Sequence, residues 1–247
     1  MRSVLILFFL LSASFPACPQ SRTIAPSGWR LIIDENISTE NTNLIQSYLE
    51  EAKKYYRIEW GLKLPEMISV HVYNTSASFQ KASHQSRAAA ASWDGSTVHI
   101  QNPSVIKKRN VLQETIIHEI AHIALQSRWK QRAPVWFEEG FAVYCANEIA
   151  SLPRPRKSID RLGSFGDEKI KTTGLRALQH WYATAGTLVF IFIREMGKEN
   201  LRQMLSPGSD ASFEECVATA MKMPYHLFEK KLIKSFNLYI GITSPSH

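Results

Sequence analysis

The segment 118–122, which reads HEIAH, constrains this chain more than any other stretch. Residues four apart lie on the same face of an α-helix, so a helix through this segment presents the imidazoles of His118 and His122 to one metal ion. Glu119 is turned by about 100° around such a helix. Its carboxylate can therefore border the metal without binding it, which is the position of a general base. The alternative is a structural helix without metal, and the surrounding sequence helps to decide between the two.

A third ligand is expected from the segment 136–142, which reads WFEEGFA. Zinc prefers four ligands, and catalytic sites usually take three from the protein and leave one position for water. Glu139 lies far enough beyond His122 for one helix to end, the chain to turn and a second helix to return against the first. We therefore predict one Zn²⁺ ion held by His118, His122 and Glu139.

The sequence around the histidines predicts a helix with one packed side and one open side. Apolar residues recur opposite the histidines at helical spacing, namely Leu112, Ile116, Ile120 and Ile123. Pro134 then marks the start of a second helix, because proline is favoured in the first helical turn. One side of the first helix can pack in a core while the other faces a cleft, which favours the metal site over the metal-free helix.

The pairing of HEIAH with WFEEGFAVY at 136–144 resembles the gluzincin branch of zinc metallopeptidases, and specifically the peptidase MA-like proteins. Two further segments are similar to that family: 88–100, with an alanine-rich stretch, a turn and a short strand, and 182–185, where Ala185 replaces the family's serine. The likeness extends over residues 67–236. It implies an α+β, zincin-like fold, a thermolysin-like half-domain in which a small, twisted, mixed sheet with an edge strand at the cleft precedes a mainly helical C-terminal half.

The resemblance implies a zinc-dependent peptidase that acts on a peptide or protein substrate, with Glu119 as the general base. The developing oxyanion needs a donor besides zinc, and we expect Tyr182 in this role, with His180 as its rival. The edge strand is expected to bind the substrate by strand addition, and we assign it to Thr97, Val98, His99 and Ile100. The alternative function is a catalytically silent zinc-fold module for binding or assembly in the cell envelope.

The N-terminal residues predict export. Arg2 precedes an eight-residue apolar run at 4–11 and then small residues, a pattern typical of a secretory signal peptide over residues 1–17. Cys18 follows directly, so lipid attachment at Cys18 and ordinary cleavage nearby are both open. We expect the mature protein in the bacterial periplasm or cell envelope, either lipid-anchored to the membrane or secreted, with residues 22–247 forming a single zincin-like peptidase domain.

Charge and cysteine content narrow the class further. The formal net charge is +7, with basic residues at expected helix ends and in the connector 151–174. They lack interleaved aromatic residues and belong to no recognisable nucleic-acid module, so we expect no nucleic-acid partner. Cys145 and Cys216 fit either one disulfide or two buried thiols. The oligomeric state does not follow from these residues.

Periodicity predicts strands early and helices late, the order expected of an α+β domain. The expected strands are 29–34, 67–73 and 97–100. The expected helices are 39–59, capped by Ser38 or Thr39, and 76–84, 104–128, 134–149, 175–196, 198–205, 213–220 and 227–238. The connector 151–174 is long for a compact domain, so a mobile cleft flap and a plain insertion are both open.

Overall fold

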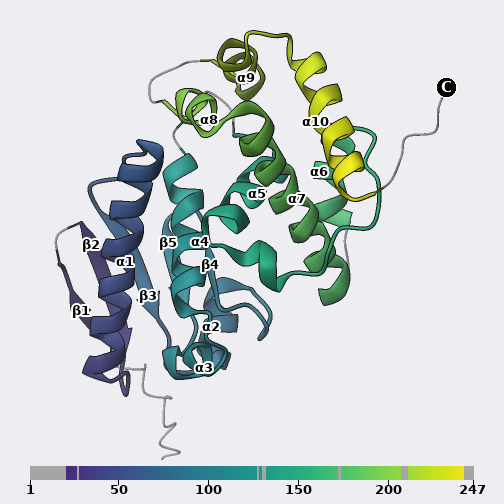
Figure 1. Ribbon diagram of the computed structural model, residues 1–247. Coiled ribbons are helices and arrows are strands. Elements are labelled where there is room, and N and C mark those ends of the chain that lie inside the picture. The colour runs from purple at the N-terminus through teal and green to yellow at the C-terminus, as the bar shows by residue number, and fades with distance from the viewer. Residues whose placement is uncertain are drawn as a thin grey trace, which may run out of the picture.

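A five-stranded mixed sheet forms one side of the computed structural model, which describes residues 21–26, 28–126, 128–129, 132–171, 174–206 and 211–241 (Figure 1). Its strands are β1 (Ser21–Ile24), β2 (Trp29–Asp34), β3 (Ile68–Val72), β4 (Ala91–Trp93) and β5 (Thr97–Ile100). The spatial order is β1-β2-β3-β5-β4, with β2, β3 and β5 parallel and the two outer strands antiparallel to their neighbours. The expected signal peptide 1–17 and Cys18 lie outside the described residues.

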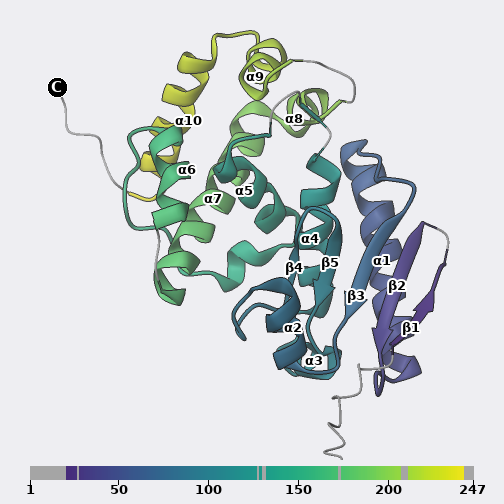
Figure 2. The same cartoon turned by 180° about the vertical axis from the view of Figure 1, so that it is seen from behind.

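Helices make up most of the remaining chain. They are α1 (Thr39–Trp60), α2 (Ser76–Ser83), α3 (Pro103–Lys108), α4 (Leu112–Leu125), α5 (Val135–Cys145), the 3₁₀ turn η1 (Glu148–Ser151), α6 (Leu162–Lys171), α7 (Leu175–Met196), α8 (Lys198–Met204), α9 (Phe213–Met221) and α10 (Tyr225–Tyr239). Figures 1 and 2 show α1 and α4 on one face of the sheet and α5 to α10 gathered beyond its β4 edge. The expected α+β architecture is confirmed. Within the described residues, no helix combines the length and apolar character needed to cross a membrane.

The core between the sheet and its two helices follows from alternation in the strands. Leu31, Val70 and Val98 are aligned across β2, β3 and β5, and all three are buried. Successive strand residues point to opposite faces, so one face of each strand is apolar and packs against the helices. The buried hydroxyl of Tyr56 in α1 donates to the carbonyl of Ile117 in α4 at 2.8 Å, which fixes the two helices relative to each other.

A polar network occupies the other face of the sheet. The Tyr73 hydroxyl lies 2.7 Å from Nδ1 of His99, whose Nε2 lies 2.9 Å from an Asp94 oxygen. Burial alone would raise the pKa of Asp94, but hydrogen bonds from His99, Thr97 and Ser96 hold it well below its usual range. The ionised Asp94 carboxylate accepts a hydrogen bond from Nε2–H of His99. Nδ1 of His99 therefore carries no hydrogen and accepts a hydrogen bond from the Tyr73 hydroxyl. His99 therefore ties the turn between β4 and β5 to the rest of the sheet.

The prediction that Thr97–Ile100 is an edge strand is wrong. Thr97–Ile100 forms β5, which pairs with β3 on one side and β4 on the other. An interior strand has no unpaired backbone groups to offer, so Thr97, Val98, His99 and Ile100 cannot bind a peptide by strand addition. The edge beside the helical half is β4, Ala91–Trp93, a three-residue strand that the sequence analysis placed in a loop and turn.

Four other features differ from expectation. The helix expected at 104–128 is divided into α3 and α4 by Asn110, whose φ of 53° is a left-handed conformation that asparagine tolerates better than most residues. The helix expected at 134–149 ends at Cys145, before Asn147 at φ 57°. The connector 151–174 contains α6, and β1 was missed. The cap at Ser38 is confirmed, because its side chain accepts the amide proton of Asn41.

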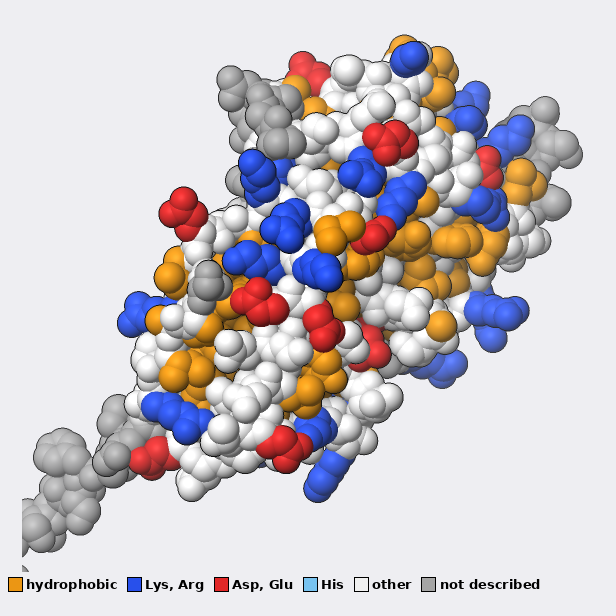
Figure 3. Space-filling view, turned by 60° about the vertical axis from the view of Figure 1, so that its left-hand side comes forward, with side chains coloured by type: hydrophobic (Ala, Val, Ile, Leu, Met, Phe, Trp, Pro, Cys, Tyr) orange, Lys and Arg blue, Asp and Glu red, His pale blue; other side chains and the backbone are white. Residues whose placement is uncertain are grey.

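Surface charge and the cysteines complete the description. Figure 3 shows a face on which basic and acidic side chains are interspersed among apolar ones. Cys145 is buried and Cys216 half-buried, and both are thiols rather than a disulfide. Burial raises the pKa of the Cys145 thiol to about 12. A thiol with so high a pKa is protonated at neutral pH and unreactive.

The helical half is organised around a close contact between α5 and α7. A Cβ at Gly140 would lie 2.3 Å from the backbone oxygen of Ala185, a distance that no side chain tolerates. Glycine therefore permits the approach of α5 to α7. The sequence analysis did not predict that α5 packs against α7 at Gly140.

We predict that Gly140→Ala lowers the free energy of unfolding by about 1–3 kcal/mol, because the added methyl group forces the two backbones apart. Gly163→Ala in α6 is the matched control, since a Cβ there meets no atom within 4 Å. The control should stabilise the helix slightly, by less than about 1 kcal/mol. Urea denaturation of both variants measures the difference. Equal effects of the two substitutions would contradict the tight α5–α7 contact.

Candidate metal centre

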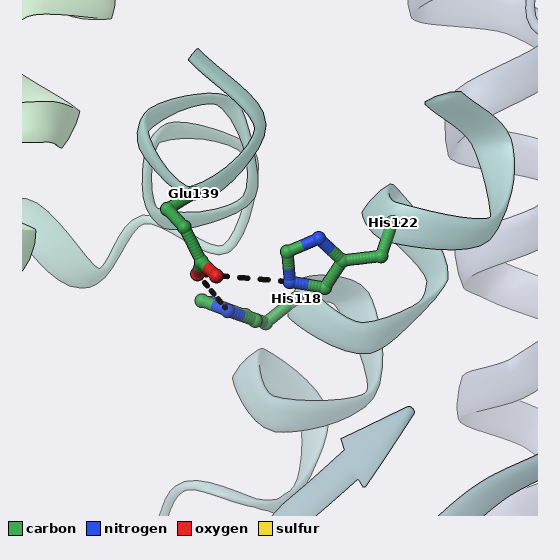
Figure 4. Close-up of side chains that lie close together, drawn as sticks. All are labelled: His118, His122 and Glu139. Atoms are coloured by element: carbon green, nitrogen blue, oxygen red, sulfur yellow. Dashed lines mark ion pairs between the residues drawn. The ribbon is translucent and has the colours of Figure 1, made fainter. Parts of the chain in front are cut away.

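His118 and His122 lie on the open side of α4, as the helical period requires (Figure 4). The opposite side of α4 is buried in the core through Leu112, Ile116, Ile120 and Ile123, which confirms the expected packing. Both imidazoles direct Nε2 towards one oxygen of Glu139, which reaches them from α5. Two segments that are separate in sequence thus place three ligand-type side chains around one point.

The spacing of these atoms suits a metal ion better than direct hydrogen bonds. Glu139 Oε2 lies 3.6 Å from Nε2 of His118 and 3.7 Å from Nε2 of His122. These separations exceed the usual 2.7–3.2 Å of an N–H···O hydrogen bond, whereas ligands of a tetrahedral zinc ion with bonds of about 2.1 Å lie about 3.4 Å apart. The ligand atoms of the three residues all lie within 4.8 Å of one another, the single such cluster in the described part of the chain. Two imidazoles and one carboxylate are a donor set that fits zinc.

Glu138 and Glu139 have different environments although they are adjacent. Glu138 points away from the histidines, and its two oxygens accept from Nε of Arg132 at 2.9 and 2.7 Å. Its side chain is only 7% exposed. Neighbouring helical residues are turned by about 100°, so α5 can direct only one of the two carboxylates at the histidine pair. That carboxylate belongs to Glu139.

Glu148 is a further member of the site that the sequence analysis missed. Its Oε2 lies 3.2 Å from Nδ1 of His118. A carboxylate accepts a hydrogen bond, so in the neutral imidazole that binds a metal this contact places the hydrogen on Nδ1 and leaves the Nε2 lone pair directed towards Glu139. Metal-binding histidines commonly hold such a carboxylate on the second nitrogen, where it fixes ring orientation. The sequence does not predict this role for Glu148. The residue follows the left-handed Asn147 and lies outside the helix of Glu139, so helical spacing does not relate the two.

Negative charge dominates the centre. Burial alone would lower the pKa of His118, but the carboxylates of Glu148, Glu139 and Glu119 raise it well above its usual value. Glu119 is buried beside the cluster. Its burial raises its pKa to about 7, with His118 opposing the rise, Glu139 and Glu148 adding to it, and a hydrogen bond from the Trp93 amide opposing it. The three carboxylates make the site negatively charged, which suits a bound cation.

The cluster opens into a cleft of about 670 Å³, one wall of which is residues 88–93. The carbonyl of Ala90 accepts from Gln101 at 2.9 Å, and the amide of Asp94 donates to Thr97 at 3.3 Å. Hydrogen bonds to one neighbour alternate along an antiparallel strand, so Ala91 and Trp93 direct their backbone groups away from β5. The open edge at the cleft is therefore formed by β4.

Tyr182 reaches the metal centre, whereas His180 does not. The Tyr182 ring centroid lies 6.3 Å from that of His118, and Tyr182 lines the same cleft. Burial, with the nearby charge of Glu139, raises the pKa of Tyr182 well above 10, so its hydroxyl keeps its proton. His180 lines a separate cavity of about 730 Å³ on the other side of α7, between the connector and the buried rings of Phe165 and Trp181.

Comparisons with known proteins support the fold. No protein-family model matches the chain, and a search of curated proteins finds no match either. Among solved structures, the chain is similar to Legionella pneumophila aminopeptidase A, a crystal structure in complex with aspartic acid, with a TM-score of 0.56 and 11% sequence identity. The match covers 88% of this chain but only 28% of that chain. At this identity the likeness shows a shared fold, and membership of the gluzincins stays a prediction.

We predict that Glu139→Ala abolishes stoichiometric zinc binding, because it removes one of three ligands. Glu138→Ala is the matched control and should retain zinc, although it loses the ion pair with Arg132. Both variants are purified, incubated with zinc, desalted and measured by atomic emission. Full zinc in Glu139→Ala together with loss in Glu138→Ala would overturn the ligand assignment.

Proposed function

We propose that the protein is a zinc-dependent peptidase of the gluzincin type, which hydrolyses peptide bonds with Glu119 as the general base. The observation that carries this proposal is the convergence of His118, His122 and Glu139 within 4.8 Å, in a cleft that also holds the buried carboxylate of Glu119. One solved structure with a similar fold is that of an aminopeptidase, which agrees with the proposal. We propose further that the protein is exported through the segment 1–17 and that Cys18 is a candidate lipid anchor.

The chain's own residues have separate roles in this reaction. Zinc bound at the cluster would act as a Lewis acid on the scissile carbonyl and lower the pKa of an attacking water. Glu119 takes the proton of that water and delivers it to the leaving amine. Tyr182 donates its hydroxyl proton in a hydrogen bond to the oxyanion as negative charge develops there. Glu148 holds His118 in the orientation that the metal requires.

The open edge of β4 can orient an extended substrate in the cleft. The backbone N–H and C=O of Ala91 face the cleft and can pair with an extended peptide, which then lies as an additional antiparallel strand. Backbone pairing selects for extended conformation and little for sequence. The role that the sequence analysis gave to Thr97–Ile100 thus passes to Ala91–Trp93, one strand nearer the metal.

We predict that Glu119→Gln folds and retains zinc but loses peptidase activity by about 10²–10⁴-fold, because the amide keeps the shape of the side chain and cannot accept the proton. Cleavage of an unfolded protein substrate by wild type and variant, with zinc content measured in parallel, tests this. Activity close to that of wild type would show that Glu119 is not the base. A wild type that binds zinc and cleaves nothing would favour the catalytically silent binding module.

We predict that Tyr182→Phe lowers kcat by about 10²–10³-fold while zinc content is unchanged, because the substitution removes only the hydroxyl. His180→Ala is the matched control from the preceding turn of α7, and its kcat should equal that of wild type. Steady-state kinetics on a single peptide substrate distinguishes the two. If His180→Ala loses activity and Tyr182→Phe keeps it, the role belongs to the histidine.

A further inference from the structure

Three leucines line the cleft on the side where α7 begins. Leu152 follows η1, whereas Leu175 and Leu178 lie in the first turns of α7. Leu175, Leu178 and Tyr182 follow one another at intervals of three and four residues, so they share one face of the helix. Two separate segments therefore bring apolar side chains to the cleft that holds the metal centre.

One of these leucines is highly exposed, and the other two are partly buried. Leu175 is 61% exposed, more than any other large apolar side chain in the described part of the chain. Leu152 and Leu178 are partly buried beside it. Exposed apolar groups that cluster in a concave surface mark binding sites, because burial against a ligand removes their surface from water. Leu175 stays largely exposed in the folded chain and lines the cleft, so a ligand bound there can bury it.

Apart from Trp93 on the strand side, the rest of the cleft is lined mostly by small, polar or charged side chains. Residues 88–91 are four alanines, whose small methyl groups leave the open edge of the sheet accessible. The carboxylates of Glu119, Glu139 and Glu148 belong to the metal centre, and Arg132 is paired with Glu138. A large substrate side chain held near the metal thus meets alanines and Trp93 on the strand side and leucines on the α7 side.

We propose that Leu152, Leu175 and Leu178 form a specificity site for a large apolar side chain of the substrate. The protein would then cleave extended peptides next to residues such as leucine or phenylalanine in preference to alanine or aspartate. This inference rests on the proposed peptidase function. It adds the chemical class of the preferred substrate and the residues that select it.

The test uses octapeptides with fluorescein at the N-terminus and an amide at the C-terminus, in which every residue is alanine except one. That residue is leucine, phenylalanine or aspartate and is moved along the peptide, with all-alanine as reference. Wild type is compared with the double variant Leu175→Ser/Leu178→Ser. The matched control is Leu238→Ser, because Leu238 is 57% exposed on α10 and does not line the cleft. Zinc content and thermal midpoint are measured for all proteins.

We expect wild type and Leu238→Ser to prefer the leucine or phenylalanine peptide over all-alanine by at least about tenfold in kcat/KM at one position. The double variant should lose most of that preference, with zinc content unchanged. Equal preference in the double variant and wild type would overturn the assignment of the leucines. Absence of any preference for large apolar residues in wild type would overturn the substrate class while the peptidase function stands.

A measurement of peptide binding tests the leucine site independently of peptide hydrolysis. Fluorescence anisotropy of the same peptides with zinc-loaded Glu119→Gln, with and without the two serine substitutions, measures affinity in the absence of turnover. Tighter binding of the apolar peptides, lost with the serines, supports the leucine site even if wild type hydrolyses nothing. Equal binding of all peptides contradicts it even if wild type is an active peptidase.

Discussion

The contact between α5 and α7 at Gly140 is the constraint on which the site depends. The backbones meet at Ala185, and each helix carries a functional side chain close to that point: Glu139 directly before Gly140 and Tyr182 about one turn before Ala185. The histidines come from α4, which is held to the sheet by its apolar back. The proposed metal centre therefore lies where the helical half meets the sheet half, and its geometry depends on rigid packing rather than on a loop.

Electrostatics and the sheet edge converge on the same place. Glu119, Glu139 and Glu148 surround His118, and their negative charge requires a cation or protons for compensation. The backbone of Trp93, the last residue of β4, lowers the pKa of Glu119. The next residue, Asp94, is anchored through His99 to Tyr73. The network on the outer face of the sheet thus holds the edge strand against the carboxylate that we assign as base.

Much of this could be predicted from the sequence because periodicity is a local property. The 3.6-residue period places His118 and His122 together, and alternation identifies β5 as a strand. Alternation does not give the order of strands in a sheet, so β5 was mistaken for the edge, and β4 was missed because Ala-Ser-Trp is short and weakly patterned. Glu148 reaches His118 after a left-handed residue, which no local period encodes. Helical spacing does place Leu175 and Leu178 on one face, but that this face lines the cleft is a tertiary contact.

The position of a bound metal tests the account most directly. A crystal of the zinc-incubated protein, with data collected on both sides of the zinc absorption edge, locates the ion by its anomalous scattering. We predict one peak about 2.0–2.2 Å from Nε2 of His118, Nε2 of His122 and a carboxylate oxygen of Glu139. Glu119 should lie beside the ion without binding it. Absence of a peak at this cluster, or a zinc ion bound by Glu138 in place of Glu139, would contradict the proposed centre.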